Sequence, residues 1–390
     1  MSGKKDPRHS AEGGAGPARI LIYSNDAAFA KSAASTFAAV PHYQVLQHTL
    51  EEALFDLEGK SADLIVVDVG GGAVLGDDRL RALRAANRNT PLVVISEALP
   101  AERVREVVQL KADDWLVRPL ANNALLETAA SQLGGSRAMR CEIFGVIGAI
   151  GNPGATTVAI ALADALNQEA RPSTSELCLI DLDFASGACG AYLDVANEFD
   201  FDTIFTAPER IDLELLELIC HRHSTGFDLL SVRRPDFLLS SRQDNFVLQL
   251  LDVASYRYKR IVLDLPSYPT TWTAALIAEL DRLVVVTETT IPAIKSAKQR
   301  FDEAASIRQT DKGISVLANR EKRRFLSREL TRSDVAEGLG RDDVDFLPED
   351  RALITEALNR GVLPAQARAS APFNKQIKQF VRKLRGEEKT

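Results

Sequence analysis

Cysteine is scarce in this chain, which contains four cysteines in 390 residues. Cys141, Cys178, Cys189 and Cys220 are scattered and lack the spacing of a zinc or redox motif. In the segment 220–223 two histidines stand at i and i+2 on a predicted helix, where they point apart, so we expect no zinc. Few cysteines, set in or beside apolar segments, are typical of a reducing compartment, and we expect a cytoplasmic protein.

Long apolar runs are also missing, since no stretch approaches the roughly 20 residues that a helix needs to cross a bilayer. Residues 1–17 have no apolar stretch, so we expect a disordered arm rather than a secretory signal. A net charge of −7 argues against general nucleic-acid binding, and no specific nucleic acid is expected. What remains is a globular composition, with 45% hydrophobic residues, in a chain long enough for two domains.

The first predicted domain, residues 18–133, alternates apolar runs with helical patterns. This alternation predicts an α/β fold with a doubly wound parallel sheet. The predicted strands are Ile20–Tyr23, Leu64–Val69, Leu92–Ile95 and Trp115–Val117, and the predicted helices are Phe29–Ala39, Leu80–Ala86 and Ala101–Leu110.

Polar residues after these strands resemble those of a response-regulator receiver domain. Asp68 stands where that family has its phosphoacceptor, Ser96 matches its Ser/Thr, and Arg118-Pro119 matches its Lys-Pro. The acidic pair that should follow the first strand is replaced by Ser24-Asn25, with Asp26 one place later, and neutral side chains bind Mg²⁺ poorly. We therefore expect an atypical receiver-like domain, kept as a docking or dimerisation surface, in which Asp68 is not phosphorylated. The alternative is a phosphorylated switch.

A polar joint, residues 134–140, leads to a second predicted α/β domain, residues 141–370, so two doubly wound parallel-sheet domains are expected in series. Its predicted strands are Ile143–Ile147, Leu177–Asp181, Phe227–Ser231, Arg260–Asp264, Arg282–Thr287 and Gly313–Asn319. Its predicted helices include Val158–Leu166, Leu213–His221, Phe246–Tyr256 and Ile294–Ile307.

The ten residues Gly148–Thr157, GAIGNPGATT, lie between a predicted strand and a predicted helix, which is the context of a phosphate-binding loop. Against the pattern GxxxxGK[ST], Ala149 stands at the first glycine and Ala155 at the lysine, whereas Gly154 and Thr156 match. The start of the helix still offers free N–H groups to an anion. The loop has the outline of a nucleotide site without its lysine.

Carboxylates end two further predicted strands of this domain. Asp181 and Asp183 are spaced i, i+2, which on a strand places both on one face. Asp264 ends another strand, in the position of a Walker-B carboxylate. Because parallel strands end at one edge of a sheet, these side chains should meet near the loop.

In this order the motifs resemble the ParA/MinD group of deviant Walker ATPases, whose loop reads KGGxGKTT. With a receiver-like domain ahead of them, they resemble the CpaE/TadZ family of Flp (tight-adherence) pilus assembly proteins. The resemblance covers about residues 19–370 and includes Asp264-Leu265-Pro266, Leu347–Asp350 and Ala357–Gly361. In the family pattern Ile150 stands at the signature lysine and Asn152 at a glycine.

The resemblance implies ATP with Mg²⁺ as the cofactor. It implies Asn319 as a contact of the adenine and Asp183 as the residue that orients attacking water. The implied nucleotide positions are Gly151, Asn152, Gly154, Ala155, Thr156, Thr157 and Asn319, and the implied magnesium positions are Thr156, Asp181 and Asp264. Loss of both lysines removes the cations that stabilise phosphoryl transfer, so we expect a pseudo-ATPase with little or no hydrolysis. ATP binding itself stays open.

The C-terminal segment, residues 371–390, predicts a basic amphipathic helix. Its apolar stripe consists of Phe373, Ile377, Phe380, Val381 and Leu384, with lysine and arginine around it. By resemblance to MinD-like proteins, this helix would contact an anionic membrane surface. The alternative is that the stripe docks on the ATPase-like domain.

We therefore expect a localisation or scaffolding protein for assembly of Flp pili. By resemblance, it would be a homodimer that places the pilus assembly ATPase and its membrane platform at a cell pole or at the inner face of the inner membrane. The alternatives are a slow ATP-driven dimer switch of the ParA/MinD type and a signalling regulator controlled by the receiver-like domain.

Overall fold

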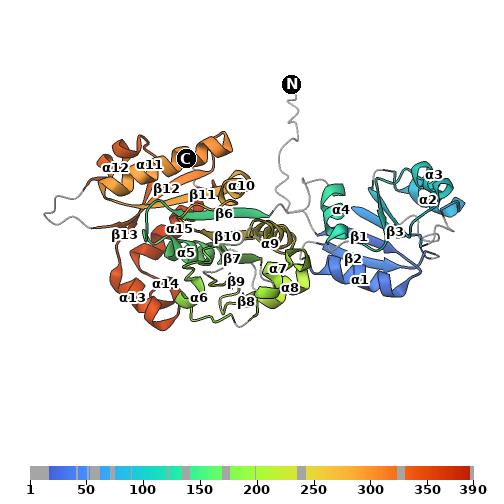
Figure 1. The fold of residues 1–390 in the computed structure, drawn as a ribbon, viewed down its shortest axis with the longest axis horizontal. Coiled ribbons are helices and arrows are strands. Elements are labelled where there is room, and N and C mark those ends of the chain that lie inside the picture. Colours follow the sequence, from blue (N-terminus) through green and yellow to red (C-terminus); the bar gives the residue numbers. More distant parts are fainter. Residues whose placement is uncertain are drawn as a thin grey trace, which may run out of the picture. The chain divides into compact units, whose positions relative to one another are not determined.

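The computed structural model describes residues 17–40, 43–50, 52, 62–70, 75–88, 90–120, 123–133, 141–168, 176–197, 199–234, 243–322 and 330–386. These residues form two compact units, unit 1 within Met1–Arg140 and unit 2 within Cys141–Thr390 (Figure 1). The predicted joint, residues 134–140, lies outside the described residues, as does all but the last residue of the predicted arm.

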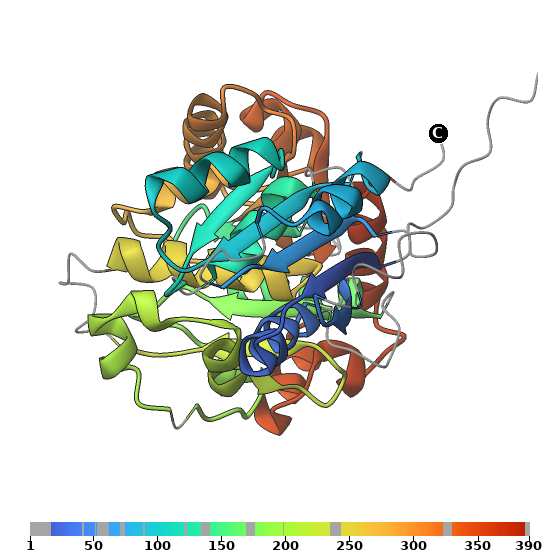
Figure 2. The same ribbon diagram turned by 90° about the vertical axis from the view of Figure 1, so that its right-hand side faces the viewer.

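Unit 1 is a five-stranded parallel sheet with the strand order β2-β1-β3-β4-β5, and Figure 2 shows its arrows pointing the same way. This doubly wound order is shared by flavodoxin and the receiver CheY. Every residue of β3 and β4 is buried, because helices cover both faces of such a sheet. The strands are β1 (Ala18–Tyr23), β2 (Tyr43–His48), β3 (Leu64–Asp68), β4 (Leu92–Ser96) and β5 (Asp114–Val117).

The helices of unit 1 are α1 (Ala27–Ala38), α2 (Asp78–Ala86), α3 (Ala101–Gln109) and α4 (Ala124–Gln132). Leu83 of α2 and Val107 of α3 share one core cluster with the strand residues Leu21, Ile65 and Val94. The first helix begins after Asp26, whose carboxylate accepts hydrogen bonds from two backbone N–H groups of the first turn.

Unit 2 is an eight-stranded sheet with the order β13-β12-β11-β6-β10-β7-β9-β8, parallel except for β8. Both units are therefore α/β with parallel sheets, which confirms the predicted fold class. The strands are β6 (Glu142–Gly148), β7 (Leu177–Asp181), β8 (His221–Arg222), β9 (Asp228–Ser231), β10 (Arg260–Leu265), β11 (Arg282–Glu288), β12 (Ile314–Glu321) and β13 (Val344–Pro348).

Helices connect these strands and position their carboxyl ends. The helices are α5 (Ala155–Asn167), α6 (Cys189–Tyr192), α7 (Asp202–Thr206), α8 (Leu213–Ile219), α9 (Gln243–Arg257), α10 (Thr273–Glu279), α11 (Ile291–Arg308), α12 (Arg332–Leu339), α13 (Arg351–Arg360), α14 (Pro364–Ala367) and α15 (Pro372–Leu384), with a 3₁₀ turn at Pro208–Arg210. The predicted helix Leu213–His221 was two residues too long, because His221 already pairs with β9 in strand β8.

The C-terminal helix distinguishes between the two alternatives that the sequence left open, membrane contact and docking on the domain. All five apolar residues of its stripe are buried in the core of unit 2, between 2% and 7% exposed. α15 contacts α5 and β13, so docking on the domain, the alternative left open by the sequence, is what the structure shows. A buried stripe is not available to lipid. Among the described helices, none has the length and apolar character that crossing a bilayer requires.

Candidate functional site

The loop between β6 and α5 contains two residues with left-handed backbones. Asn152 has a φ of 56° and Gly154 a φ of 85°, and asparagine tolerates this conformation better than most side chains. The N–H of Ala149 donates to the carbonyl of Val286, 2.8 Å away, which ties the loop to β11. Gly154 is the N-cap residue of α5, and no side chain of this residue occupies the first N–H groups of the helix. The first N–H groups of the helix therefore face the loop and can bind an anion.

Asn319 in β12 holds the loop from the side. Its Nδ2 donates to the carbonyl oxygen of Pro153 at 2.9 Å, and the side chain is 5% exposed. A Cβ on Gly154 would lie 2.6 Å from this Nδ2, so a glycine is required there. Asn319, for which the resemblance implies an adenine contact, thus also holds the backbone of the phosphate loop in place.

A cavity of about 310 Å³ opens beside this contact. Its walls include Gly154 and Thr157 of the loop, Arg320 of β12, and Pro348 with Ile354 on the far side. The guanidinium Nη2 of Arg320 lies 3.9 Å from the position that a Cβ on Gly154 would take. A cation therefore lies next to a loop whose own lysine is missing.

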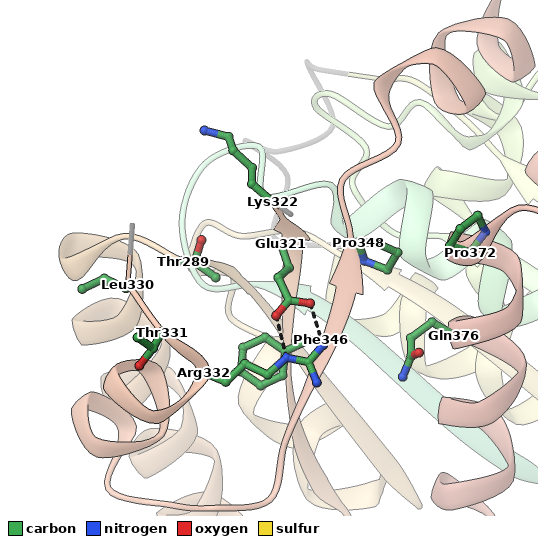
Figure 3. Close-up of a pocket in the computed structure, with 10 residues that line it drawn as sticks. All are labelled: Thr289, Glu321, Lys322, Leu330, Thr331, Arg332, Phe346, Pro348, Pro372 and Gln376. Carbon is green, nitrogen blue, oxygen red and sulfur yellow. Dashed lines mark hydrogen bonds and ion pairs between the residues drawn. The ribbon is translucent and has the colours of Figure 1, made fainter. Parts of the chain in front are cut away.

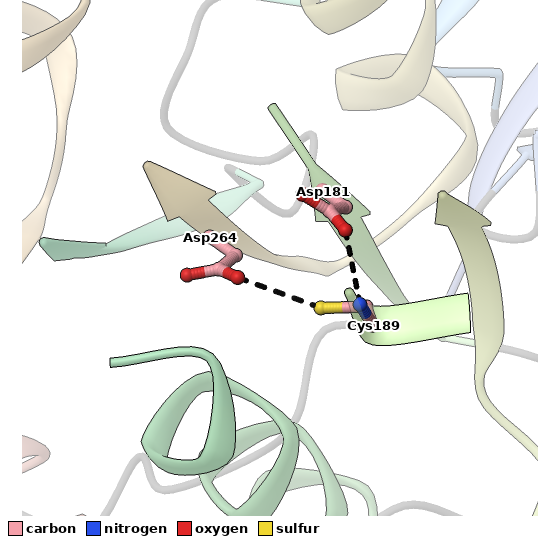
Figure 4. Close-up of side chains that lie close together, drawn as sticks. All are labelled: Asp181, Cys189 and Asp264. Carbon is pink, nitrogen blue, oxygen red and sulfur yellow. Dashed lines mark hydrogen bonds between the residues drawn. The ribbon is translucent and has the colours of Figure 1, made fainter. Parts of the chain in front are cut away.

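A buried cluster of acidic groups lies at the same edge of the sheet, where Asp181 of β7 and Asp264 of β10 are register partners. Figure 4 shows Cys189, the first residue of α6, between them. Its N–H donates to Asp181 Oδ2 at 3.0 Å, and its Sγ donates to Asp264 Oδ2 at 3.6 Å. Ser231 Oγ also donates to Asp181 Oδ2, at 2.9 Å. One possible ligand atom from each of Asp181, Cys189 and Asp264 lies within 4.8 Å of the others.

Burial shifts the protonation of this cluster. It raises the pKa of Asp181 to about 6, and the charge of Asp183 adds to the effect. Burial, followed by the charge of Asp181, raises the pKa of Asp264 well above its ordinary value, while a hydrogen bond with the side chain of Thr156 lowers it. Burial also raises the pKa of the Cys189 thiol. The hydroxyl of Thr156 and the carboxylate oxygens of Asp181 and Asp264 are the ligand types that suit Mg²⁺.

The structure thus brings together Thr156, Asp181 and Asp264, the three residues predicted for magnesium. Asp183 lies beyond the end of β7, so the argument from one strand face does not apply to it. Its carboxylate accepts hydrogen bonds from Ser186 Oγ at 3.0 Å and from the hydroxyl of Tyr268 at 2.9 Å. The carboxylate that would orient water is therefore already hydrogen-bonded by two side chains.

Asp68 in unit 1 is held by three donors of the protein. Ser24 Oγ and the guanidinium of Arg118 donate to its Oδ2, the latter at 2.7 Å, and the N–H of Gly70 donates to its Oδ1 at 3.1 Å. Arg118 also pairs with Asp26 at 3.0 Å and lies over the ring of Phe29. Hydrogen bonds from the backbone of Phe29 and from Arg118 lower the pKa of Asp26. An arginine thus joins the acidic groups between which a receiver would hold its metal.

Ser96 and His223, which the sequence analysis also considered, both have hydrogen-bond partners in the structure. Ser96 Oγ accepts from Trp115 Nε1 at 2.8 Å and donates to the carbonyl of Glu97 at 2.7 Å. The ring Nδ1 of His223 lies 2.9 Å from Thr225 Oγ1, away from a cysteine or carboxylate cluster among the described residues.

A second cavity, of about 520 Å³, lies near the ends of β12 and β13 (Figure 3). Glu321 and Arg332 form a bidentate pair on its wall, with distances of 2.5 and 2.7 Å, and the arginine lies over the ring of Phe346. This cavity is not lined by the start of α5, whereas the loop cavity is, so the loop cavity is the stronger candidate for an anion.

Several residues of the site were not predicted from the sequence. Cys189, Ser231 and Tyr268 belong to no motif, and each reaches the carboxylates from a different segment. Gly187 is a further case, because a Cβ there would lie 2.7 Å from Asp181 Oδ2.

A P-loop-like turn and strand-end carboxylates on a parallel sheet define the class of nucleotide-binding α/β folds. No protein-family model matches the chain. The septum site-determining protein MinD of Thermotoga maritima is 23% identical over 242 residues, which are 61% of this chain and 85% of that protein.

Two solved structures are similar to this chain in fold. A ParA family ATPase from Chlorobium tepidum is 21% identical, covers 62% of this chain and 98% of its own, and has a TM-score of 0.53. MinD from Pyrococcus horikoshii, complexed with Mg-ADP, is 15% identical, covers 63% and 96%, and has a TM-score of 0.52. The chain therefore contains a ParA/MinD-type fold, and the share of the chain that these structures cover is similar in length to unit 2.

Proposed function

We propose that this protein is a localisation or scaffolding component of Flp pilus assembly, built on a ParA/MinD-type fold that holds nucleotide with little or no hydrolysis. The observation that carries the proposal is the contrast within one site. The carboxylates and the helix start are in place, but alanine stands where the loop lysine belongs.

Nucleotide binding is supported by the residues at the loop. The N–H groups at the start of α5 would bind the phosphates, and Thr156 and Asp264 would hold Mg²⁺. Mg²⁺, when bound, would supply positive charge to the phosphate oxygens. The raised pKa values of Asp181 and Asp264 support this role, because a buried carboxyl pair gains most when a cation neutralises it. The MinD relative bound to Mg-ADP is consistent with such a site.

Low turnover is supported by the residues that would surround the phosphates of a bound nucleotide. Ala155 and Ile150 replace the cations that would stabilise charge during phosphoryl transfer. Ser186 and Tyr268 donate hydrogen bonds to Asp183, so they would compete with a water for its carboxylate oxygens. Nucleotide would then act as a structural ligand that favours a homodimer.

For unit 1 we propose an atypical receiver-like domain that serves as a docking or dimerisation surface. Arg118 already pairs with both Asp68 and Asp26, so a guanidinium lies between these two carboxylates. Acetyl phosphate with Mg²⁺ should therefore fail to label Asp68. Stoichiometric labelling that is lost in Asp68→Asn would favour the signalling regulator instead.

The nucleotide part is tested on the full-length protein by titration with ATP and ADP, with and without Mg²⁺, and by an ATPase assay. We expect binding without significant hydrolysis. ATP turnover at the rate of active ParA/MinD proteins, abolished by Asp264→Asn, would overturn it. The cellular part is tested by deleting the gene in its host: pili should be lost or misplaced, and a fluorescent fusion should form foci where pili emerge. Normal, correctly placed pili would overturn it.

The second candidate is a slow ATP-driven dimer switch. The observation that favours it is Arg320, a cation beside the loop. This function requires turnover that rises when a partner is added, whereas the scaffold does not.

A further inference from the structure

Arg320 is held beside the phosphate loop by three features of the fold. Its guanidinium Nη2 lies 3.9 Å from the Cβ position of Gly154, and its Nη1 pairs with Glu288 on the neighbouring strand β11. Its backbone N–H donates to Asn319 Oδ1 at 2.9 Å. Since Asn319 in turn bonds the carbonyl of Pro153, the arginine and the loop are fixed relative to each other.

The backbone of Arg320 is left-handed, with a φ of 59°. This conformation costs free energy for a residue other than glycine, and such costs gather at functional sites. The side chain is 42% exposed, so the guanidinium is not buried as a core ion pair. A guanidinium has five N–H donors in a planar fork, and the pair with Glu288 leaves donors for a further acceptor.

The cavity that Arg320 lines also contains Gly154 and Thr157, at the start of α5. A ligand there would meet the helix N–H groups and the guanidinium, and both favour a phosphate. Glu349 and Asp350 also line the cavity, and they pair with Arg351 at 2.7 Å and with Arg368 at 3.7 Å. Asp181, Asp183 and Asp264 are not among the residues that line this cavity. The cavity that the arginine lines therefore does not include the carboxylates that hydrolysis would need.

We propose that Arg320 is the cation that binds the phosphates of a nucleoside phosphate at this loop, in place of the missing lysines, and that it contributes to binding but not to turnover. This inference rests on the proposed nucleotide site. An interaction made equally with substrate and transition state tightens binding without raising kcat. Arg320 would thus explain how a loop without lysine retains nucleotide and does not cleave it.

The test is calorimetric titration of the full chain with ADP, ATP and adenosine. Arg320→Asn removes the charge and tolerates the left-handed backbone, and Arg320→Gly does the same if the first variant fails to fold. We expect the dissociation constants of ADP and ATP to rise roughly 10- to 100-fold and that of adenosine to stay unchanged. Arg320→Lys should lie between, because it keeps the charge but not the fork.

Arg360→Ala is the matched control, since Arg360 is 54% exposed, pairs with Glu356 at 2.9 Å and is not among the residues that line this cavity. It should bind ADP nearly as the unaltered protein does. Unchanged ADP binding by Arg320→Asn, or an equal loss for adenosine, would overturn the inference and leave the proposed function standing. If the unaltered protein binds no nucleotide, both fail. A fall in residual ATP turnover at saturating nucleotide would contradict a role in binding alone.

Discussion

Asp181 and Asp264 stand opposite each other on the neighbouring strands β7 and β10, with exposures of 1% and 3%. Two carboxyl groups so placed cannot both ionise without a cost, because water is excluded and like charges repel. The folded protein therefore retains protons that the unfolded chain would release. This relationship makes the stability of unit 2 depend on pH.

We predict that unit 2 loses stability as pH rises from about 4 to about 7. The pKa of Asp181 is raised from 3.8 to about 6, so its contribution is full below pH 4 and is lost as pH passes through 6. For this group alone the loss is about 3 kcal/mol. Urea unfolding between pH 4 and pH 8 measures it.

Asp181→Asn should remove much of this dependence and stabilise the nucleotide-free protein at pH 8. The exposed aspartate Asp302 on α11 provides the control, since Asp302→Asn should leave the profile as it is. A stability that is flat or rises over this window would contradict the prediction.

Restoring the loop lysine should increase affinity before it increases activity. Ala155→Lys places a charge at the first residue of α5, and we expect ATP to bind about tenfold or more tightly. Hydrolysis should remain low, because Ile150 still replaces the signature lysine and Asp183 still bonds to Tyr268. Calorimetry and an ATPase assay measure the two effects separately.

Ala155→Gln is the control for this change, because it lengthens the side chain without a charge. If glutamine tightens ATP binding as much as lysine does, charge is not what the loop lacks.

Removal of Arg118 should destabilise unit 1. Asp68 is 3% exposed, and without the guanidinium it retains only Ser24 and an N–H donor. We expect Arg118→Ala to lower the free energy of unfolding of unit 1 by about 2–3 kcal/mol. The double variant Arg118→Ala/Asp68→Asn should recover part of this loss, because no buried charge is then left unpaired. Chemical denaturation of the three proteins gives the comparison, and a double variant worse than the single one would refute this account.

Truncation of Phe380 tests the position of the C-terminal helix. Phe380 is 2% exposed in the core of unit 2, so Phe380→Ala should cost about 3–5 kcal/mol of stability. Lys375→Ala, at an exposed position on the same helix, should cost little. The unaltered protein should not sediment with anionic vesicles. Vesicle binding that disappears in Phe380→Ala would show that the stripe leaves the domain.

Most strands could be predicted from the sequence because parallel sheets buried on both faces produce continuous apolar runs. The missed strands lack this signal. In β2 two exposed glutamines stand on either side of two partly buried residues, β8 has two residues, and β13 contains Asp345 and ends at Pro348. The error at His221 has a similar cause, since a two-residue antiparallel strand produces no pattern of its own.

The candidate site was predictable where it follows strand ends and not where it depends on long-range contacts. Thr156, Asp181 and Asp264 could be placed together from topology alone. The bond between Asn319 and Pro153 joins residues 166 positions apart, and the pairing of Arg118 with Asp68 spans 50 positions. Such contacts depend on loop conformation and side-chain reach, which periodicity does not encode.

The burial of α15 against α5 has a mechanical consequence. The helix that starts at the phosphate loop and the last described helix share one packed interface, and Arg282 Nε of β11 donates to the carbonyl of Leu384 at 2.9 Å. A shift of α5 on ligand uptake would therefore carry α15 with it. The fluorescence of a dye attached just after Leu384 would therefore change when a ligand binds at the phosphate loop, which lies at the start of α5.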